Sequence, residues 1–397
     1  MEKSNIDEKI KLLTGSGMWH TQEVEGLPSV HLSDGPHGLR KQEEKERQNN
    51  VSLVSTCYPT ASALACSWDV TAAERLGGAV AKEAWNADVA VLLGPGINMK
   101  RSPLCGRNFE YFSEDPFLAG RLGAAYVSAA QGEDVAVSLK HFAANNQETN
   151  RQTSNSQIDE RALREIYLSA FEYVVKTARP ATVMASYNRL NGYYACENRH
   201  LLTEILREEW GFDGVVISDW GACADLAKAV KAGMDLEMPD SHGIHARKLK
   251  AALKAGEISE EDIAKAAGRI EKLVKKYAPD NRAKKDTSDA HGIAKQLACE
   301  SAVLLKNDNA VLPLKSEEPV AVFGRVQLDW FYVGYGSGGD VNPPYKVNLM
   351  EGLENAGVAV DQELAQTYAQ WCAENEPFMG FWGHWPRYFD EMPLTDD

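Results

Sequence analysis

Residues 214–222 read GVVISDWGA, and this stretch decides the fold that the rest of the chain must follow. Residues 214–217 form a short apolar run with β-branched side chains, which is typical of a strand buried on both faces. The run gives way to Asp219 and Trp220. A carboxylate at the end of a buried strand costs desolvation free energy unless something uses it. Two interpretations stay open from this stretch alone: Asp219 caps the next helix, or it is the reactive group of an enzyme.

Similar apolar runs recur through the first part of the chain, and most of them end in polar or charged residues. The seven runs are residues 29–34, 61–69, 89–93, 135–140, 181–187, 214–219 and 233–238. Helical patterns lie between them, the clearest over residues 158–176, where apolar side chains recur at i, i+3, i+4 and i+7. Strands that alternate with helices predict a parallel sheet covered on both faces.

The position of the polar residues distinguishes two architectures for such a sheet. Polar groups at the carboxyl ends of several strands are typical of a barrel, whose active site lies at that face. A doubly wound sheet more often has a glycine-rich phosphate turn, and HLSDGPHG (31–38) lacks the GxGxxG spacing. We therefore predict an α/β fold with a (β/α)8-type TIM barrel. We expect it to be irregular, because an eighth strand is not evident.

The chain divides by composition into two units. We predict a barrel over residues 1–277, a linker over 278–291 (APDNRAKKDTSDAH), and the N-terminal part of an α/β sandwich domain over 292–397. The second unit is short for an independent α/β domain. It ends in an aromatic segment, EPFMGFWGHWPRYFDEMP (376–393), that has no later sequence to pack against. We expect the second domain to be incomplete.

Charge, hydropathy and cysteine spacing exclude several classes of protein. Lys and Arg total 42 against 57 Asp and Glu, a formal charge of -15 without a basic stripe, which argues against nucleic-acid or anionic-membrane binding. No apolar run reaches the ~18 residues of a membrane helix, and residues 1–15 do not resemble a secretory signal. Seven scattered cysteines, never spaced as CxxC, argue against a zinc site and a disulfide framework. We expect a cytoplasmic protein.

A sugar-cleaving site would explain the polar residues at the strand ends. Retaining glycosidases need one carboxylate that attacks the anomeric carbon and a second carboxyl group that protonates the leaving oxygen. Asp219 is placed as the nucleophile, and Trp220 beside it offers an aromatic surface for the sugar ring. Hydroxyl recognition also needs carboxylates and fixed cations that hydrogen-bond vicinal hydroxyls.

Five further residues fit hydroxyl recognition, each with a structural alternative. Lys140 and His141 end a buried strand, where they bind hydroxyls or form a buried structural ion pair. Asp34 grips two hydroxyls or caps its turn, and Arg107 is a bidentate donor or stabilises its loop. Tyr187 donates to the nucleophile or is an interior tyrosine with a satisfied hydroxyl. Their joint occurrence at successive strand ends favours the functional interpretation.

Six segments resemble the signature blocks of the family 3 glycoside hydrolases, in particular its β-glucosidases. They are LSDGPHGLR (32–40), GRNFEYFSEDPFLAG (106–120), KHFAANNQETNR (140–151), VMASYNRLNG (183–192), GVVISDWGA (214–222) and AGMDLEMP (232–239). In addition, LLKNDNAVLPLK (304–315) looks like the start of that family's second domain. The resemblance thus covers nearly the whole chain.

The resemblance implies roles for the residues that match the family's motifs. Asp219 matches the nucleophile that forms the covalent glycosyl-enzyme, and Trp220 matches the aromatic residue next to it. The positions that bind the sugar in the first subsite are matched by Asp34, Arg107, Lys140, His141 and Tyr187. The family uses no metal and no organic cofactor.

The acid/base residue is where the chain departs from the family's pattern. In multi-domain members it is a glutamate well inside the second domain, and we expect this chain to end before it. Members that act on N-acetylglucosamine use a histidine after a KHFPGHG-like string, and KHFAANNQE here closes that route. The alternative candidates, without a surrounding motif, are Glu363, Glu374, Glu376 and Glu391.

The sequence therefore predicts a retaining β-glucosidase with a β-glucoside or oligosaccharide substrate and no nucleic-acid or membrane partner. The alternatives are a β-xylosidase or an α-L-arabinofuranosidase on the same scaffold, or a catalytically crippled sugar-binding fragment. A missing C-terminal region or oligomerisation would complete the second domain.

Overall fold

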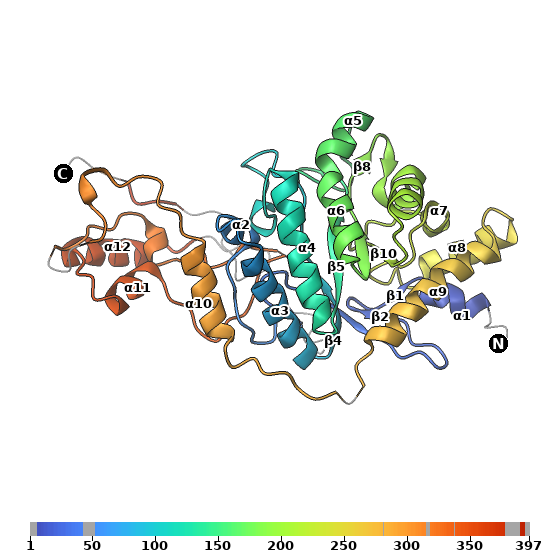
Figure 1. The fold of residues 1–397 in the computed structure, drawn as a ribbon, viewed down its shortest axis with the longest axis horizontal. Helices are drawn as coiled ribbons and strands as arrows, with labels where there is room; N and C mark the ends of the chain where they lie inside the picture. Colours follow the sequence, from blue (N-terminus) through green and yellow to red (C-terminus); the bar gives the residue numbers. More distant parts are fainter. Residues whose placement is uncertain are drawn as a thin grey trace.

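The centre of the molecule is a seven-stranded sheet in the order β1-β2-β3-β4-β5-β7-β10 (Figure 1). The computed structural model describes residues 6–42, 52–280, 282–314, 318–336, 338–377 and 390–393. The strands are β1 (Gly15–Ser16), β2 (His20–Thr21), β3 (His31–Asp34), β4 (Val89–Leu93), β5 (Ala136–Phe142), β7 (Thr182–Ala185) and β10 (Val215–Ser218). A small second sheet joins β6 (Asn155–Ser156), β8 (Arg189–Leu190) and β9 (Tyr193–Tyr194).

The strands from β3 to β10 pair in parallel, as the alternation of strands and helices predicts. Ser218 at the end of β10 pairs with Ala185 at the end of β7, and Asp34 at the end of β3 pairs with Leu93. The short strands β1 and β2 add antiparallel pairs beyond β3. The carboxyl ends of the parallel strands therefore lie at one edge of the sheet, and the residues that follow them can meet.

The sheet curls as half a barrel, and the expectation of a full (β/α)8 barrel is confirmed only in part. The named strands do not close on themselves as a continuous ladder. The predicted strand over residues 233–238 contributes only single bridges, Ile217 to Leu236 and Thr14 to Glu237. Glu237 still exchanges backbone hydrogen bonds with Leu13 and Gly15, so this segment spans between β10 and the start of β1.

Helices cover the sheet, and their caps show why they begin where they do. The helices of the first unit are α1 (Ile6–Leu12), α2 (Ala61–Ala65), α3 (Val70–Asn86), α4 (Pro116–Gly132), α5 (Glu160–Ala162), α6 (Ser169–Ala178), α7 (Leu226–Ala232), α8 (Ile244–Lys254) and α9 (Glu260–Tyr277). The side chains of Asp69 and Asp115 cap α3 and α4, and Ser259 with Asp262 forms a capping box on α9. Packing of α3 on α4 and of α4 on α6 builds one face of the molecule.

Short helices of other types complete the element order. The 3-10 turns are Asn108–Glu110, Ala195–Glu197, Asp308–Ala310 and Arg325–Gln327, and the π-helical stretches are Leu163–Tyr167 and His200–Glu209. The helix predicted over residues 158–176 is therefore α5, a π turn and α6 in succession.

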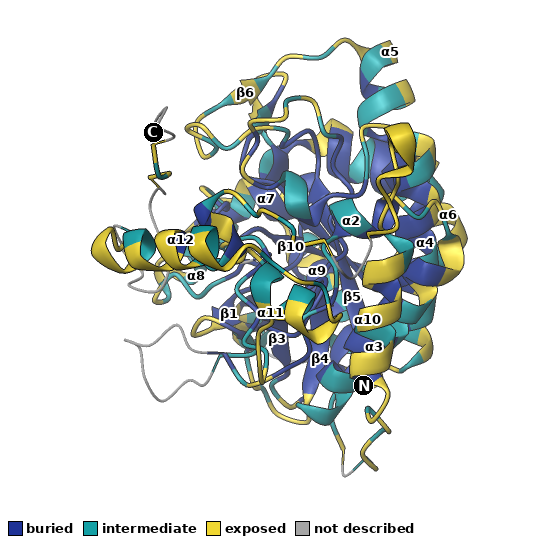
Figure 2. Ribbon diagram, turned by 90° about the vertical axis from the view of Figure 1, so that its left-hand side faces the viewer, coloured by how far each residue is buried: buried dark blue, intermediate teal, exposed yellow. Residues whose placement is uncertain are grey.

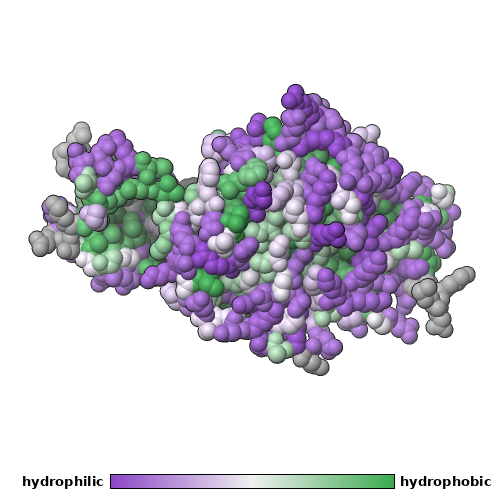
Figure 3. Space-filling view, viewed as in Figure 1, coloured by the Kyte–Doolittle hydropathy of each residue, from purple (hydrophilic) through white to green (hydrophobic). Residues whose placement is uncertain are grey.

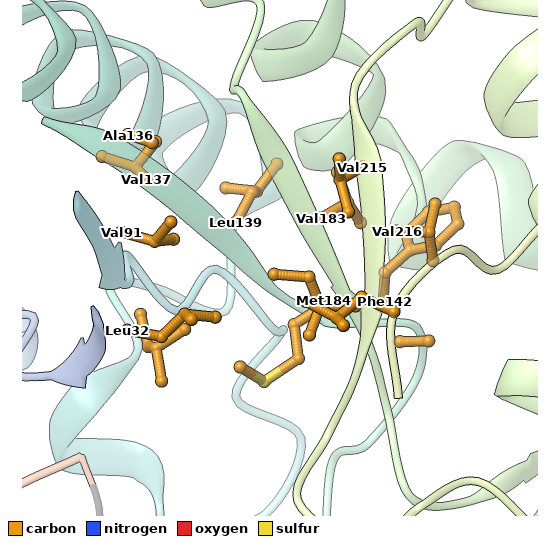
Figure 4. Close-up of a cluster of buried hydrophobic side chains, with 14 of the residues drawn as sticks. Leu32, Val91, Ala136, Val137, Leu139, Phe142, Val183, Met184, Val215 and Val216 are labelled. Carbon is orange, nitrogen blue, oxygen red and sulfur yellow. The ribbon is translucent and has the colours of Figure 1, made fainter. Parts of the chain in front are cut away.

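The core lies between the sheet and these helices. Leu32, Val91, Leu139, Val183 and Val216 come from five neighbouring strands and gather in one apolar cluster (Figure 4). Each of them is fully buried. Burial of such side chains stabilises the fold by roughly 1.5–3 kcal/mol each relative to exposure. Figure 2 shows this buried interior behind helices α10 (Ala290–Glu300) and α12 (Gln362–Glu374), most of whose residues are exposed.

The strand predicted over residues 61–69 is wrong. Residues 61–69 begin with helix α2, because Thr60 caps its first turn and its sequence, ASALA, is rich in the best helix former. An apolar run of this length does not by itself distinguish a strand from a buried helical turn.

The second unit follows the segment between α9 and α10, which runs along the bottom of Figure 1. Its helices are α10 (Ala290–Glu300), α11 (Leu349–Asn355) and α12 (Gln362–Glu374). Large hydrophobic side chains lie exposed here, Leu304, Leu305 and Phe323 among them, and Figure 3 shows hydrophobic residues gathered in this part. The boundaries of the domains stay a prediction, and residues 378–389 of the aromatic segment lie outside the described residues.

No helix within the described ranges has the length and apolar character needed to cross a membrane.

Candidate active site

A cavity of about 500 Å³ lies at the carboxyl ends of the parallel strands. The seven residues that the sequence singles out all line it: Asp34, Arg107, Lys140, His141, Tyr187, Asp219 and Trp220. They follow or end β3, β5, β7 and β10, or lie on the loop after β4. The parallel register of the sheet therefore brings together residues that are up to 186 positions apart, from Asp34 to Trp220.

Asp219 presents one held and one free carboxylate oxygen. Its Oδ1 accepts a hydrogen bond of 2.7 Å from the backbone N–H of Trp220. Its Oδ2 is buried and has no hydrogen-bond partner in the described chain. The helix-cap interpretation is wrong, because the side chain that caps α7 is Asp225. A buried, unpartnered carboxylate oxygen that faces a cavity is the geometry of a nucleophile awaiting an electrophilic carbon.

His141 is fixed in one tautomer by its two ring partners. Nε2 lies 2.8 Å from Nη2 of Arg107, and Nδ1 lies 3.0 Å from the Tyr111 hydroxyl. Arginine can only donate, so Nε2 accepts and the ring proton sits on Nδ1, donated to Tyr111. Burial, with Arg107 and Lys140 nearby, holds the pKa of His141 well below its usual range. The ring is therefore neutral.

The neutral ring explains why Oδ2 of Asp219 stays free. Nε2 of His141 is 3.7 Å from Oδ2, with its lone pair already used by Arg107. No proton lies between these two atoms, and His141 does not quench the nucleophile by a hydrogen bond. Asn98 holds the backbone of His141 through bonds of 2.7 and 2.9 Å, which fixes the ring's position at the end of β5.

A buried charge network supports the sugar-binding residues. Nζ of Lys140 lies 3.8 Å from Oδ1 of Asp34 and 3.5 Å from Oε2 of Glu110. Glu110 also accepts from Nε of Arg107 at 2.5 Å, and Arg40 lies 3.4 Å from Asp34. Lys140 therefore forms the buried ion pair of the structural alternative, and it also lines the cavity. Cations and carboxylates fixed in this way are suited to vicinal hydroxyls.

The pKa values of the two network carboxyls are shifted in opposite directions. Burial alone would raise the pKa of Glu110, but Arg107 and Lys140 outweigh burial and hold the pKa at about 2. Burial raises the pKa of Asp34, although Lys140 and Arg40 oppose it. Glu110 is thus a permanent anion between Arg107 and Lys140, and it orients both cations toward the cavity.

Aromatic side chains close one side of the cavity. The Trp220 ring lies 5.3 Å from that of Trp19, and its Nε1 donates to the Met18 carbonyl at 2.8 Å. The Tyr187 hydroxyl donates to the Trp220 carbonyl at 3.0 Å. This bond matches the structural alternative for Tyr187, an interior tyrosine with a satisfied hydroxyl. Burial and the nearby Asp219 raise the pKa of Tyr187, so its phenol stays protonated.

The sequence arguments missed several lining residues. Trp19 and Met18 come from the turn between β1 and β2, and Tyr335, Gly336 and Gly338 come from the glycine-rich segment after residue 329. Glu110 was also missed, although its spacing of three residues from Arg107 in GRNFE is a usable signal for an ion pair. The other lining residues that were missed are Arg40, Gln42, Gly106, Glu148, Arg151 and Met184.

The glycine-rich segment sits on the cavity because glycine allows close approach. A Cβ placed on Gly338 would overlap the Glu110 carboxylate. The neighbouring Asp340 lies 3.5 Å from Nε of Arg40, and Asn342 donates to the Ser52 carbonyl at 2.9 Å. The second unit therefore contributes directly to the wall of the site.

We expect Gly338→Ala to displace this segment and to weaken sugar binding. Overpacking at a tight contact costs about 1–3 kcal/mol, a loss of roughly 5- to 150-fold in affinity if it falls wholly on the bound state. Titration of glucose followed by tryptophan fluorescence measures the change, because Trp19 and Trp220 line the cavity. Gly132→Ala is the matched control, since a Cβ there meets no described atom within 4 Å and Gly132 does not line the cavity. Equal glucose affinities of both variants and the parent protein would contradict the proposed role of the Gly338 contact in sugar binding.

The carboxyl groups of the described residues do not include a clear proton donor. In the cavity, each one besides Asp219 contacts a cation: Asp34 with Lys140, Glu110 with Arg107, and Glu148 with Arg151 at 2.7 Å. A neighbouring cation favours the ionised form, which prevails at Glu110, while burial raises the pKa of Asp34. The candidates Glu363, Glu374, Glu376 and Glu391 are all exposed and do not line the cavity.

A second cavity, of about 580 Å³, lies between α10 and the segments 56–60 and 330–347. Its described lining carries aromatic rings and the cations Lys295 and Lys346, but no carboxyl group. Volume alone therefore does not identify the reactive site. The carboxylate of Asp219 does.

Buried neutral histidines predict a loss of stability in acid. Burial lowers the pKa of His37 to about 4, and the unfolded pKa is about 6.5. Between these values the unfolded chain binds a proton that the folded chain does not, so stability falls as pH falls. We expect His37→Gln to reduce the slope of unfolding free energy against pH by up to about 1.4 kcal/mol per unit.

Urea unfolding between pH 4 and 7 measures that slope, with His200→Gln as the control. Hydrogen bonding to Glu204 raises the pKa of His200, so its contribution is present at low pH and lost as pH rises. The two variants should change the slope in opposite directions. A change of this slope in the same direction in both variants would contradict the assigned pKa shifts of His37 and His200.

Comparisons with known proteins agree with this geometry. Residues 36–273 match the family described as "Glycosyl hydrolase family 3 N terminal domain". The "Thermostable beta-glucosidase B" of Acetivibrio thermocellus is 47% identical over 363 residues, covering 90% of this chain and 48% of that protein. An "Exo-alpha-(1->6)-L-arabinopyranosidase" of Bifidobacterium longum is 42% identical and covers 90% and 49%.

A solved structure shares the fold. The β-glucosidase 3B of Thermotoga neapolitana in complex with glucose has a TM-score of 0.87 at 37% identity, and the match covers 94% of this chain and 56% of that one. The chain spans about half the length of the curated relatives it matches. A family match over more than half of the residues, joined to the same fold, leads to one conclusion: this chain belongs to glycosyl hydrolase family 3.

Proposed function

We propose that the cavity hydrolyses terminal, non-reducing β-D-glucosyl residues with retention of configuration, through a covalent glycosyl-aspartate on Asp219. The observation that carries the proposal is Oδ2 of Asp219, which is buried, has no hydrogen-bond partner among the described residues, and lies 3.7 Å from a neutral His141. The relatives named β-glucosidase, and the glucose-bound structure among the similar folds, support the choice of sugar.

In the first step Oδ2 of Asp219 attacks the anomeric carbon, and the bond from that carbon to the leaving oxygen breaks. The N–H of Trp220 holds Oδ1, so the free oxygen keeps its direction toward the sugar. In the second step water attacks the same carbon and releases Asp219. The leaving oxygen gains a proton in the first step, and the attacking water loses one in the second.

The remaining residues hold the glucosyl ring during both steps. Asp34 and Lys140 face its hydroxyls from the buried charge network, and Arg107 adds donors beside His141. The rings of Trp220 and Trp19 offer an apolar face against the sugar. Their positions are fixed before the sugar arrives, which reduces the entropic cost of reaching the transition state.

General acid catalysis typically contributes about 10²–10⁴-fold, and each described cavity carboxyl other than that of Asp219 contacts a cation. We therefore expect this chain to prefer substrates with acidic leaving groups. A panel of nitrophenyl glycosides tests the proposed sugar: the β-D-glucoside should turn over fastest.

The panel also includes the β-D-xyloside, the α-L-arabinofuranoside and the α-L-arabinopyranoside. The last is a specific rival, because a relative bearing the arabinopyranosidase name covers as much of this chain as the β-glucosidase does. If one of these pentosides is hydrolysed faster than the glucoside, the proposed preference for glucosyl residues is wrong. Equal inactivity on every glycoside, with glucose still bound, would favour the sugar-binding fragment.

A further inference from the structure

Three side chains of metal-binding type converge behind the nucleophile. They are Cys223 on the loop after β10, Glu237 in the segment that bridges to Thr14, and His245 in the first turn of α8. Their ligand atoms all lie within 4.8 Å of one another. None of the three lines the cavity that holds Asp219. The cluster is therefore separate from the sugar site.

The spacing of the three atoms is close to what a small cation requires. Tetrahedral bonds of about 2.0–2.3 Å place ligand atoms about 3.3–3.8 Å apart. Rotamer adjustments of roughly an ångström would bring the cluster from its present spacing to that geometry. A thiolate, an imidazole and a carboxylate together form a donor set that suits zinc.

The hydrogen bond inside the cluster marks the place of the cation. Nδ1 of His245 contacts Oε1 of Glu237 directly, so one proton is shared between a ring nitrogen and a carboxylate oxygen. Ser241 lies 3.5 Å from the other oxygen, Oε2. A cation that takes the place of the shared proton keeps both groups satisfied and adds the sulfur of Cys223.

Burial makes the cluster more than a surface group of acids. Cys223 and Glu237 are 5% and 3% exposed, while the His245 side chain reaches solvent at 17%. The partly exposed His245 provides an entry path for a cation into an otherwise buried cluster.

We propose that Cys223, Glu237 and His245 form a binding site for a thiophilic divalent cation, with Zn²⁺ as its best match. On binding, the cation forms one bond each to sulfur, oxygen and nitrogen. The thiol proton and the proton shared by His245 and Glu237 leave to solvent. No oxidant or reductant takes part. Water or Asp240, which is close enough to influence Glu237, completes the coordination.

Occupancy would tie the nucleophile's loop to the neighbouring segment. The N–H of Ser218 donates to the Leu236 carbonyl at 2.9 Å, and the N–H of Gly221 donates to the Met238 carbonyl at 2.8 Å. These bonds already flank Asp219 on both sides. A cation held by Cys223 and Glu237 adds a third link between the same two segments, and so restrains the loop that carries Asp219 and Trp220.

Titration of the chain with Co²⁺ tests the site, because a Co²⁺–thiolate bond gives a charge-transfer band in the near ultraviolet. We expect one equivalent to produce the band and Zn²⁺ to displace it. Cys223→Ser should abolish the band. His245→Gln should weaken Zn²⁺ binding by more than the roughly 10–100-fold that removal of an outer partner costs.

Two matched controls keep the test specific. Cys66→Ser removes an exposed thiol, and His200→Gln removes a surface imidazole that contacts Glu204 and Glu160. Both variants should bind Co²⁺ like the parent protein. Since His245 is half-buried on a helix, its variant tests the site even if Cys223→Ser fails to fold. A band that persists in Cys223→Ser, Zn²⁺ binding unchanged in His245→Gln, or no band in the parent protein would overturn the proposal.

Discussion

Replacement of Asp219 by Asn is expected to reduce turnover of an aryl β-glucoside by roughly 10⁴-fold or more, the scale of losing one essential catalytic group. The amide keeps the size of the side chain and still accepts the hydrogen bond from the Trp220 N–H at its oxygen. It lacks the anionic oxygen that attacks the anomeric carbon. Stopped-flow and steady-state kinetics of dinitrophenyl β-glucoside hydrolysis measure the loss. Glucose affinity is an independent measure of whether the cavity is intact.

Asp225→Asn is the control for this prediction. Asp225 caps α7 through the N–H groups of Ala227 and Lys228, and asparagine caps a helix about as well as aspartate. Its variant should keep both turnover and stability. Should Asp219→Asn retain most of the parent turnover, or should Asp225→Asn lose it, the nucleophile has been assigned to the wrong residue.

Replacement of Glu110 by Gln is expected to destabilise the fold by about 3–5 kcal/mol, the cost of breaking a buried ion pair from one side. The side chains of Glu110 and Lys140 are each only 1% exposed, so the cations left behind cannot recover their hydration. Arg107 loses its ion-pair partner at 2.5 Å. Because its guanidinium is then no longer held in position, sugar affinity should fall. Urea unfolding gives the free energy, and glucose titration gives the affinity.

Glu165→Gln serves as the comparison, because Glu165 pairs with Arg161 on the surface, where the two side chains are 61% and 83% exposed. An exposed pair of this kind contributes about 0–1 kcal/mol. A Glu110→Gln protein as stable as Glu165→Gln would show that the buried network does not hold the site together.

The parallel core of the fold could be predicted from the sequence, because period and composition carry that information. Residues 89–93 and 215–218 are continuous apolar runs, and they became β4 and β10 with every side chain buried. The strand predicted over residues 61–69 is wrong because one capping residue, Thr60, starts a helix there. Residues 233–238 pair only through single bridges, a feature of the sheet's curvature that no local pattern encodes.

The site could be predicted where each residue stands at a strand end or in a long motif. Asp219, Lys140 and His141 met this condition, and they line one cavity. Trp19 did not, because its contact with Trp220 joins residues about 200 positions apart and neither carries a signal for the other. Gly338 and Glu110 likewise meet only through the packing of the second unit on the first.

The cluster of Cys223, Glu237 and His245 shows the same limit for metal sites. Cysteine spacing argues against zinc when only CxxC pairs are considered. Here the donors come from a loop, a bridging segment and a helix, so the fold and not a motif brings them together.

The most direct test of the central claim is covalent trapping with an activated 2-deoxy-2-fluoro-β-glucoside, followed by proteolysis and mass spectrometry. The fluorine slows both steps, and the activated leaving group lets the first proceed without a proton donor. We expect one glucosyl adduct per chain, on the peptide that contains Asp219, and none in Asp219→Asn. An adduct that maps to any other peptide would contradict it.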